Sequence, residues 1–252
     1  GIKDLYMASG DLNTICSMML EKPFPPLSVY QYVISIIYVF QINFIHQEEM
    51  PVDKFAVSFG KYLESLMNEQ AIRHADRQTI QSILINFFRV LGNQFTDFTC
   101  DLESYFNFFE FCLKCEILPV QMFAMDLIHY FVTSVTDDIN VIFFSWITST
   151  NFLNLLICKN LNVEIINNIG FIFEKMGRMS LFPDAAIFMI WDRILHVHSS
   201  LKQPYMAIIA KCLEFLDPKT THEFFDRILL GNPIEPKTEQ VTVTNENSTT
   251  KE

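Results

Sequence analysis

Residues 76–91 read DRQTIQSILINFFRVL, and this stretch decides how the chain is interpreted. Asp76 is a residue type that caps helix N-termini, and Gly92-Asn93 supplies a C-terminal stop. Between them, apolar residues recur three or four positions apart, as on one face of an α-helix. These residues are Ile80, Ile83, Leu84, Phe87, Phe88 and Leu91. The stretch therefore predicts an amphipathic helix with one buried face.

The segment before it has the same character. Glu48-Glu49 and Pro51 mark a helix start, with acidic residues at the positive end of the helix and proline at an early position. Apolar residues then follow with helical spacing: Val52, Phe55, Ala56, Phe59, Leu63, Leu66 and Met67. Two amphipathic helices in succession are typical of a helical hairpin.

Helix-length apolar segments recur along the chain at a nearly constant interval. The expected helix starts fall after Asp76, at Leu118, at Leu161 and at Pro204, which are 42 or 43 residues apart. A period of about 40–47 residues, with two or three helices per unit, is typical of armadillo and HEAT repeats. We therefore predict an all-α fold, an armadillo- or HEAT-like α-solenoid of stacked helical hairpins.

Composition agrees with a helical fold and sets the domain boundaries. The 252 residues are 50% hydrophobic and include 25 Phe, whereas 7 Gly and 10 Pro leave little material for the turns of an all-β fold. We predict one helical-repeat domain over residues 1–232, most regular over 50–216. Residues 233–252 are polar and lack large aromatic side chains, which predicts a disordered tail or linker.

Two short stretches resemble a known family. Residues 152–156 (FLNLL) and 163–172 (VEIINNIGFI) resemble the last two helices of an armadillo repeat. The segments Phe111–Val132 and Leu66–Leu91 share this pattern. The resemblance rests on spacing and apolar pattern and covers Met50–Leu216.

The resemblance implies a peptide-binding surface but does not supply its residues. In armadillo proteins of the importin-α type, a Trp and an Asn four residues later bind basic nuclear-localisation peptides. The matching positions in this chain are Asn167 and Phe171. Because neither residue matches, the binding residues of that family are not transferred to this chain.

The same alignment of repeats predicts two rows of side chains on the helices that would line the inner face of the solenoid. Polar positions opposite the apolar faces are Asn86, Asp126, Asn168 and Lys211. One helical turn further come Arg89, His129, Phe171 and Glu214. If the units stack regularly, these residues line one surface, which solenoids use to bind extended partners. The alternative is that they form only the solvated face of amphipathic helices.

The charge balance restricts the class of partner. The chain has 18 Lys plus Arg against 29 Asp plus Glu, a net charge of −11. Nucleic acid binding requires clustered basic residues, so this balance argues against it. It favours a protein or peptide partner, and a basic one in particular. The same charge also serves simply to keep a hydrophobic protein soluble.

Two short motifs contain residue types that can bind metals or carry out redox chemistry. Cys112-x-x-Cys115 lies late in an expected helix without a second pair of ligands, so we predict core packing rather than a redox or zinc site. In His196-x-His198 the two side chains point to different faces of a helix, and we expect them to complement its C-terminal dipole. Neither a Gly-rich phosphate loop nor a nucleophile elbow is present. We predict no catalytic residues, no metal and no cofactor.

Membrane insertion is the next alternative. Pro23–Gln47 and Ile139–Cys158 carry no charge and are long enough to span a bilayer. Polar residues interrupt both segments, and the second is expected to be broken near Thr148–Asn151. Burying such groups in lipid without partners is costly, which argues against insertion.

The cysteines and the first residues suggest a compartment. Six Cys lie within apolar segments, and no secretory signal precedes them at Gly1-Ile2-Lys3-Asp4. Disulfide frameworks belong to small secreted domains that lack a core. We expect reduced thiols in the cytoplasm or nucleus. A chain that opens without Met is also expected to be part of a longer protein.

Two functional hypotheses follow from the sequence. The first is a non-catalytic scaffold or adaptor that binds a protein or peptide. The second is a regulatory or substrate-binding segment of a larger multidomain enzyme whose catalytic domain lies outside this chain. An integral membrane bundle is a third class, which the polar residues within the apolar segments disfavour.

Overall fold

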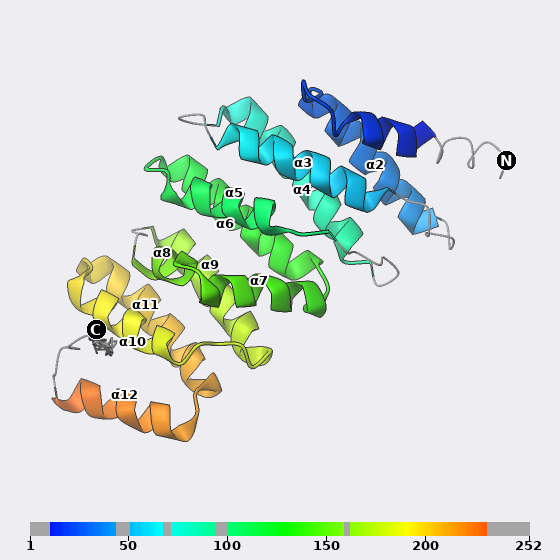
Figure 1. Cartoon of the computed structure of the whole chain (residues 1–252). Coiled ribbons are helices and arrows are strands. Elements are labelled where there is room, and N and C mark those ends of the chain that lie inside the picture. The colour runs from blue at the N-terminus through cyan, green and yellow to red at the C-terminus, as the bar shows by residue number, and fades with distance from the viewer. Residues whose placement is uncertain (1–10, 44–50, 68–71, 94–99, 159–161, 231–252) are drawn as a thin grey trace, which may run out of the picture.

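The computed structural model describes residues 11–43, 51–67, 72–93, 100–158 and 162–230. Every regular element in this part of the chain is a helix, which confirms the all-α class (Figure 1). Residues 11–18 are helical. The helices that follow are α2 (Leu27–Asn43), α3 (Val52–Leu66), α4 (His74–Leu91), α5 (Glu103–Lys114), α6 (Leu118–Ser134), α7 (Asp137–Ser149), α8 (Phe152–Cys158), α9 (Val163–Arg178), α10 (Ala185–His196), α11 (Ser199–Cys212), the 3-10 turn η1 (Leu213–Phe215) and α12 (Pro218–Leu230). The predicted polar tail at 233–252 and the acidic pair Glu48-Glu49 lie outside the described residues.

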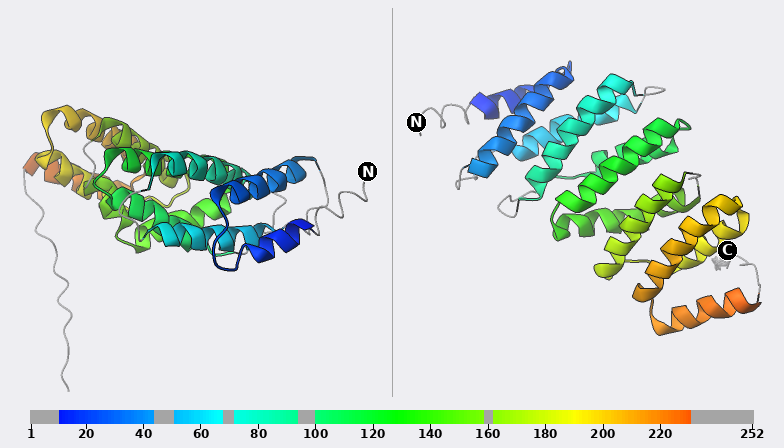
Figure 2. Two further views of the ribbon diagram at one scale, coloured as in Figure 1. Left: turned by 90° about the horizontal axis from the view of Figure 1, so that it is seen from above. Right: turned by 180° about the vertical axis from the view of Figure 1, so that it is seen from behind.

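The helices form two layers, as the two views in Figure 2 show. In the first layer α2, α4, α6, α9 and α11 lie side by side in that order. In the second layer α3 packs on α5, α5 on α8, and α8 on α10. The chain alternates between the layers, so each helix of the first layer follows one of the second.

The two clearest predicted helices are confirmed, with a change at one cap. The expected apolar faces of α3 and α4 are buried from Val52 to Leu66 and from Ile80 to Leu91. Helix α4 ends at Leu91, and Gly92 is its C-cap, as expected. It begins at His74 rather than after Asp76, and its N-cap is Arg73, which makes no side-chain capping hydrogen bond. Asp76 lies in the first turn, where a carboxylate complements the positive end of the helix.

Among the predicted helix starts that fall within the described residues, only Leu118 is confirmed. Helix α6 begins at Leu118, as predicted. Helix α9 begins at Val163, and Leu161 lies outside the described residues. Helix α11 begins at Ser199, so the prediction that Pro204 starts a helix is wrong. The physical reason is His198, whose Nδ1 accepts a hydrogen bond from the backbone N–H of Ser200 and caps α11 before the proline is reached.

The expected interruption near Thr148–Asn151 is confirmed. Helix α7 ends at Ser149 and α8 begins at Phe152. The Thr150 hydroxyl donates to the Trp146 carbonyl at 2.8 Å and accepts from the Phe152 N–H at 3.3 Å, so it satisfies groups at both ends of the break. This unit therefore has three helices, α7, α8 and α9. Among the described helices, none is both long enough and apolar enough to cross a bilayer.

Aromatic side chains fill the space between the layers. The Phe106 ring of α5 lies 5.7 Å from Phe131 of α6 and 4.9 Å from Phe143 of α7, measured between ring centroids. Phe131 and Phe143 are 5.1 Å apart. Phe88 extends the cluster to α4, 5.1 Å from Phe131. Edge-to-face and tilted ring pairs contribute about 0.5–1.5 kcal/mol each beyond the burial of their area.

Buried tyrosines join helices through backbone carbonyls. Tyr105 of α5 donates to the Ala56 carbonyl of α3 at 2.8 Å, and Tyr205 of α11 donates to the Ile157 carbonyl of α8 at 3.0 Å. Both side chains are almost fully buried, at 1% and 0% exposed. A buried hydroxyl needs such a partner, so each bond fixes the distance between two helices.

We expect Tyr105→Phe to lower the free energy of unfolding by about 1–2 kcal/mol, because the Ala56 carbonyl loses its side-chain donor in a dry environment. The matched control is Tyr32→Phe, since Tyr32 is 65% exposed. Urea unfolding followed by circular dichroism measures both. Equal midpoints for the two variants would contradict a structural role for the Tyr105 hydroxyl.

Gly177, near the end of α9, allows η1 to pack directly on that helix. A Cβ atom at this position would overlap the ring of Phe215. We expect Gly177→Ala to destabilise the chain by about 1–3 kcal/mol through overpacking. In a Phe215→Ala background the same substitution should be neutral or stabilising by up to about 1 kcal/mol, because Ala is the better helix former. A double-mutant cycle measures this coupling, and additive effects would refute the contact.

Candidate functional site

The predicted rows lie in or beside the first layer. Their residues are exposed or half-buried: Asn86 and Arg89 on α4, Asp126 and His129 on α6, Asn168 and Phe171 on α9, Lys211 on α11, and Glu214 in η1. The right-hand view in Figure 2 looks onto this layer from behind the view of Figure 1. Seven of the eight side chains therefore belong to the first layer, and Glu214 follows its last helix.

The structure brings two row members into direct contact. The rings of His129 on α6 and Phe171 on α9 lie 4.5 Å apart at their centroids, with planes inclined by 39°. The Nδ1 atom of His129 is buried, and no hydrogen-bond partner for it is present in the described part of the chain. His129 and Phe171, which the 42-residue interval places in the same row, therefore contact each other between α6 and α9.

Arg89 finds an aromatic partner that sequence reasoning missed. Its guanidinium lies over the ring of Tyr38 on α2, 6.0 Å from the centroid. Tyr38 is half-buried in a helix that has no acidic residue in its first turn and no basic residue in its last. The separation of Tyr38 from Arg89 does not match the 42–43 residue interval, so extending the rows by that interval would not have found Tyr38.

Residues that face each other across α9 and α11 do not follow the predicted 42–43 residue interval. Lys211 donates to Glu174 at 2.8 Å, and Arg178 donates to the same carboxylate at 2.6 Å. These two hydrogen bonds lower the pKa of Glu174 below its usual value. Lys211 therefore lies beside Glu174, and not beside Asn168 as the constant interval implies. Close packing of Gly170 against Ile208 places α11 in this shifted register.

Two carboxylates on the neighbouring helices α6 and α9 influence each other electrostatically. Asp126 is exposed on α6 and Glu164 is exposed in the first turn of α9. Partial burial raises the pKa of Asp126, the Glu164 charge raises it further, and His129 opposes them. Neither carboxylate has an ion-pair partner among the residues the structure describes. By contrast, Glu110 pairs with Lys114 at 2.8 Å.

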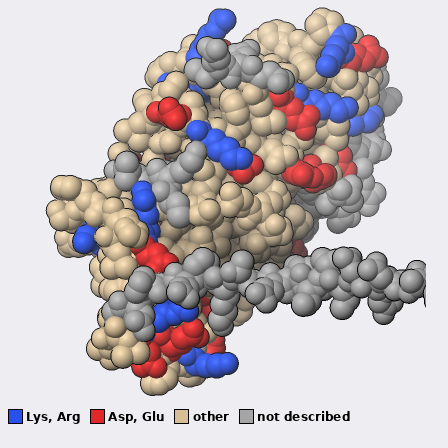
Figure 3. All heavy atoms as spheres, turned by 60° about the vertical axis from the view of Figure 1, so that its left-hand side comes forward, with Lys and Arg blue, Asp and Glu red and all other residues tan. Residues whose placement is uncertain are grey.

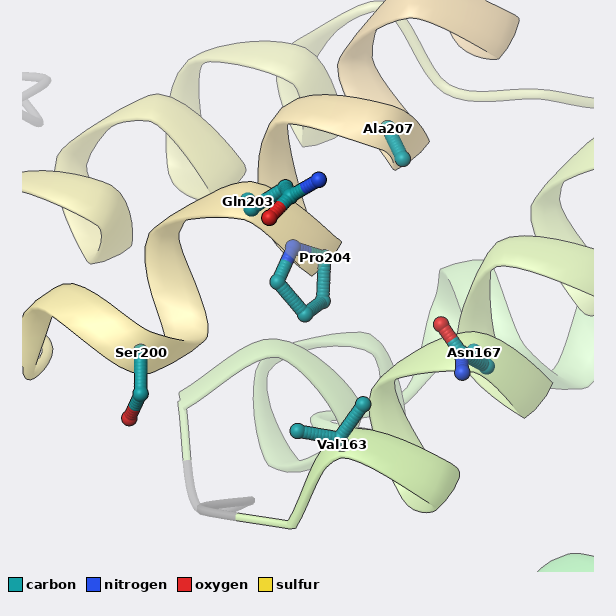
Figure 4. A pocket seen from close by; sticks show the side chains of 6 residues that line it. All are labelled: Val163, Asn167, Ser200, Gln203, Pro204 and Ala207. Carbon is teal, nitrogen blue, oxygen red and sulfur yellow. The ribbon is translucent and has the colours of Figure 1, made fainter.

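A shallow groove of about 410 Å³ lies between α9 and α11. It is lined by Val163, Asn167, Ser200, Gln203, Pro204 and Ala207, none of which is charged (Figure 4). Pro204 has no N–H, so it cannot donate to the Ser200 carbonyl one turn earlier in α11. No sequence pattern indicates this groove, because its formation depends on α11 beginning before Pro204.

Charge is dispersed on the face seen in Figure 3. Basic and acidic side chains are interspersed there among a larger area of uncharged atoms. No continuous patch of one sign covers that view. On that face, charge therefore occurs as single groups and local pairs.

The cysteine motif packs as expected, and the histidine motif has a different role from the one expected. Cys112 is fully buried in α5, where burial raises the pKa of its thiol, and Cys115 is half-buried at the end of that helix. His196 is the last residue of α10, whereas His198 caps the N-terminus of α11 rather than complementing a C-terminus. Within the described ranges, no three His, Cys, Asp or Glu side chains are grouped so as to hold a metal ion.

No family model matches this chain, and neither a curated protein nor a solved structure is significantly similar to it.

The buried thiols should be unreactive in the folded chain. Burial raises the pKa of Cys16 to about 11 and that of Cys212 to about 12, and only the thiolate is nucleophilic. We expect iodoacetamide to modify Cys112 at least about tenfold more slowly than the half-buried Cys115 at neutral pH. Peptide mass spectrometry measures both rates, with urea-unfolded chain as the control. Equal rates in the native protein would contradict the packing of α5.

Proposed function

We propose that this chain is a non-catalytic, armadillo- or HEAT-like α-solenoid that binds a protein or an extended peptide as a scaffold or adaptor. The observation that supports the proposal is the first layer, where α2, α4, α6, α9 and α11 succeed one another across one face. Each of these helices buries one side and leaves the other to solvent. A stack of this kind presents a long surface rather than a single enclosed pocket.

The binding residues we propose are the eight row positions: Asn86, Arg89, Asp126, His129, Asn168, Phe171, Lys211 and Glu214. Some of these side chains already contact their neighbours, as His129 and Phe171 do. Such contacts hold side chains in place before a partner arrives, which lowers the entropic cost of binding. The net charge of −11 supports a protein or peptide partner over nucleic acid. We propose the cytoplasm or nucleus as its setting.

The test is a charge change on the proposed surface. We expect Asp126→Lys combined with Asn168→Lys to reduce the recovery of partner proteins at least about fivefold, because both positions face outward on neighbouring helices. Affinity purification of tagged chain from cells, with quantitative mass spectrometry, measures the recovery of each co-purified protein.

The matched control changes the net charge by the same amount on other parts of the molecule. Glu21→Lys and Ser145→Lys are both at exposed positions outside the first layer. Circular dichroism verifies that both double variants remain folded. Recovery that falls equally in the two variants, or in neither, would refute the proposed surface.

A further inference from the structure

The two ends of the helix stack expose different kinds of side chain. Helix α12 forms one end, and Lys219, Glu223 and Asp226 are exposed on it (Figure 1). Helix α2 and the helix over residues 11–18, both drawn in blue, form the other end (Figures 1 and 2). The sequence of α2 carries no charge. Because the end units of a repeat stack need a polar outer face to remain soluble, an uncharged end helix indicates that a partner covers this end.

The apolar residues of α2 lie on two sides of the helix. The fully buried ones are Tyr30, Val33, Ile34 and Ile37. A second set, which we call the outer row, consists of Val29, Tyr32, Ile36 and Val39. Tyr32 is 65% exposed and Val39 is 53% exposed, and the other two residues are half-buried. The outer row has the alternating three- and four-residue spacing with which two helices pair in coiled coils.

Half of the outer row points away from the rest of the first layer. On the side of α2 that faces α4, Gln31 donates to Ser82 at 3.4 Å. Val29 precedes Gln31 by two residues, and residues two apart on a helix point to different sides. Ile36 precedes Tyr38 by the same interval, and the ring of Tyr38 lies under a guanidinium of α4. Val29 and Ile36 therefore lie on the free edge of the layer.

The helix over residues 11–18 has a similar apolar side. Lys54 of α3 donates to the Asn13 side chain at 2.6 Å and to the Ser17 hydroxyl at 2.9 Å. Ile15 is two residues from both of these acceptors, so it points away from α3. Met18 lies one helical turn after Ile15, and the two are 66% and 36% exposed, respectively. Together with the outer row, these two residues form what we call the apolar end.

The charges of the chain restrict what can cover the apolar end. The nearest charged residues along the chain are Asp11, at the start of the shorter helix, and Glu21 and Lys22, in the turn after it. A basic partner gains little from a helix without carboxylates. A second copy of this chain has a net charge of −11 and is repelled by most acidic surfaces, but not by an uncharged helix. Two identical apolar ends are also complementary to each other when a two-fold axis relates them.

We propose that the apolar end is the interface of a two-fold symmetric dimer, in which α2 of one copy packs beside α2 of the other. This pairing continues the side-by-side packing of the first layer across the dimer axis. Helix α2 has 17 residues and is about 25 Å long, so the ends cover on the order of 500 Å² per copy. Stable interfaces cover about 800 Å² per partner, so this dimer is reversible, with a dissociation constant on the order of micromolar.

The test is sedimentation velocity of the full 252-residue chain from about 1 to about 100 μM, a range that brackets this dissociation constant. We expect the sedimenting species to change from one chain to two over this range. Added salt should strengthen the dimer, because it screens the repulsion between acidic copies. Tyr32→Lys with Val39→Lys should raise the dissociation constant at least about tenfold, because it places like charges on both sides of the interface. Met18→Lys, on the shorter helix, should raise it severalfold.

The matched control introduces the same two charges at the other end of the stack. Phe225→Lys with Leu229→Lys changes residues of α12 that are 45% and 81% exposed, and it should leave the dissociation constant unchanged. Circular dichroism verifies that each variant is folded. A chain that stays monomeric throughout the range, or a dimer that the α12 variant weakens as much as the α2 variant does, would overturn this inference. The proposed function would still stand, because the apolar end shares no residue with the eight row positions.

Discussion

The packing of aromatic rings between the two layers is the contact on which the rest of the structure depends. Phe106, Phe131 and Phe143 come from α5, α6 and α7, and each touches the other two. An amphipathic helix is stable only when its apolar side is covered, because single helices of this length are marginal in water. Each helix therefore takes its position from its neighbours, and the outward side of the first layer is left to solvent.

Buried polar groups add a second constraint, which is directional where ring packing is not. The hydroxyl of Tyr105 must reach the Ala56 carbonyl, and the hydroxyl of Tyr205 must reach the Ile157 carbonyl. Each bond permits one offset between two helices and disfavours a slip by a turn, since slipping would leave a donor unsatisfied. Hydrophobic burial thus sets which helices meet, and these bonds set where along their lengths they meet.

Much of the fold was predictable from the sequence because its strongest signal is periodic. The buried faces of α3 and α4 and the start of α6 are all encoded in local spacing. The start of α11 was not predictable in this way. Pro204 is a common helix starter, yet α11 tolerates it in its second turn because His198 caps the helix earlier. Such a cap depends on a side-chain conformation, and a histidine is not among the residue types that usually signal one.

The candidate site shows why a constant period cannot supply a binding register. Across α6 and α9 the contact between His129 and Phe171 follows the sequence interval, but across α9 and α11 Lys211 is shifted toward the C-terminal half of α9, where it meets Glu174. Had α11 kept the interval, Lys211 would lie beside Asn168, one turn from Glu164. The shift removes that cation from the region of Glu164 and Asp126. The start and the register of α11 have separate causes: the cap at His198 sets where the helix begins, and the packing of Ile208 against Gly170 sets which residues of α9 its side chains meet.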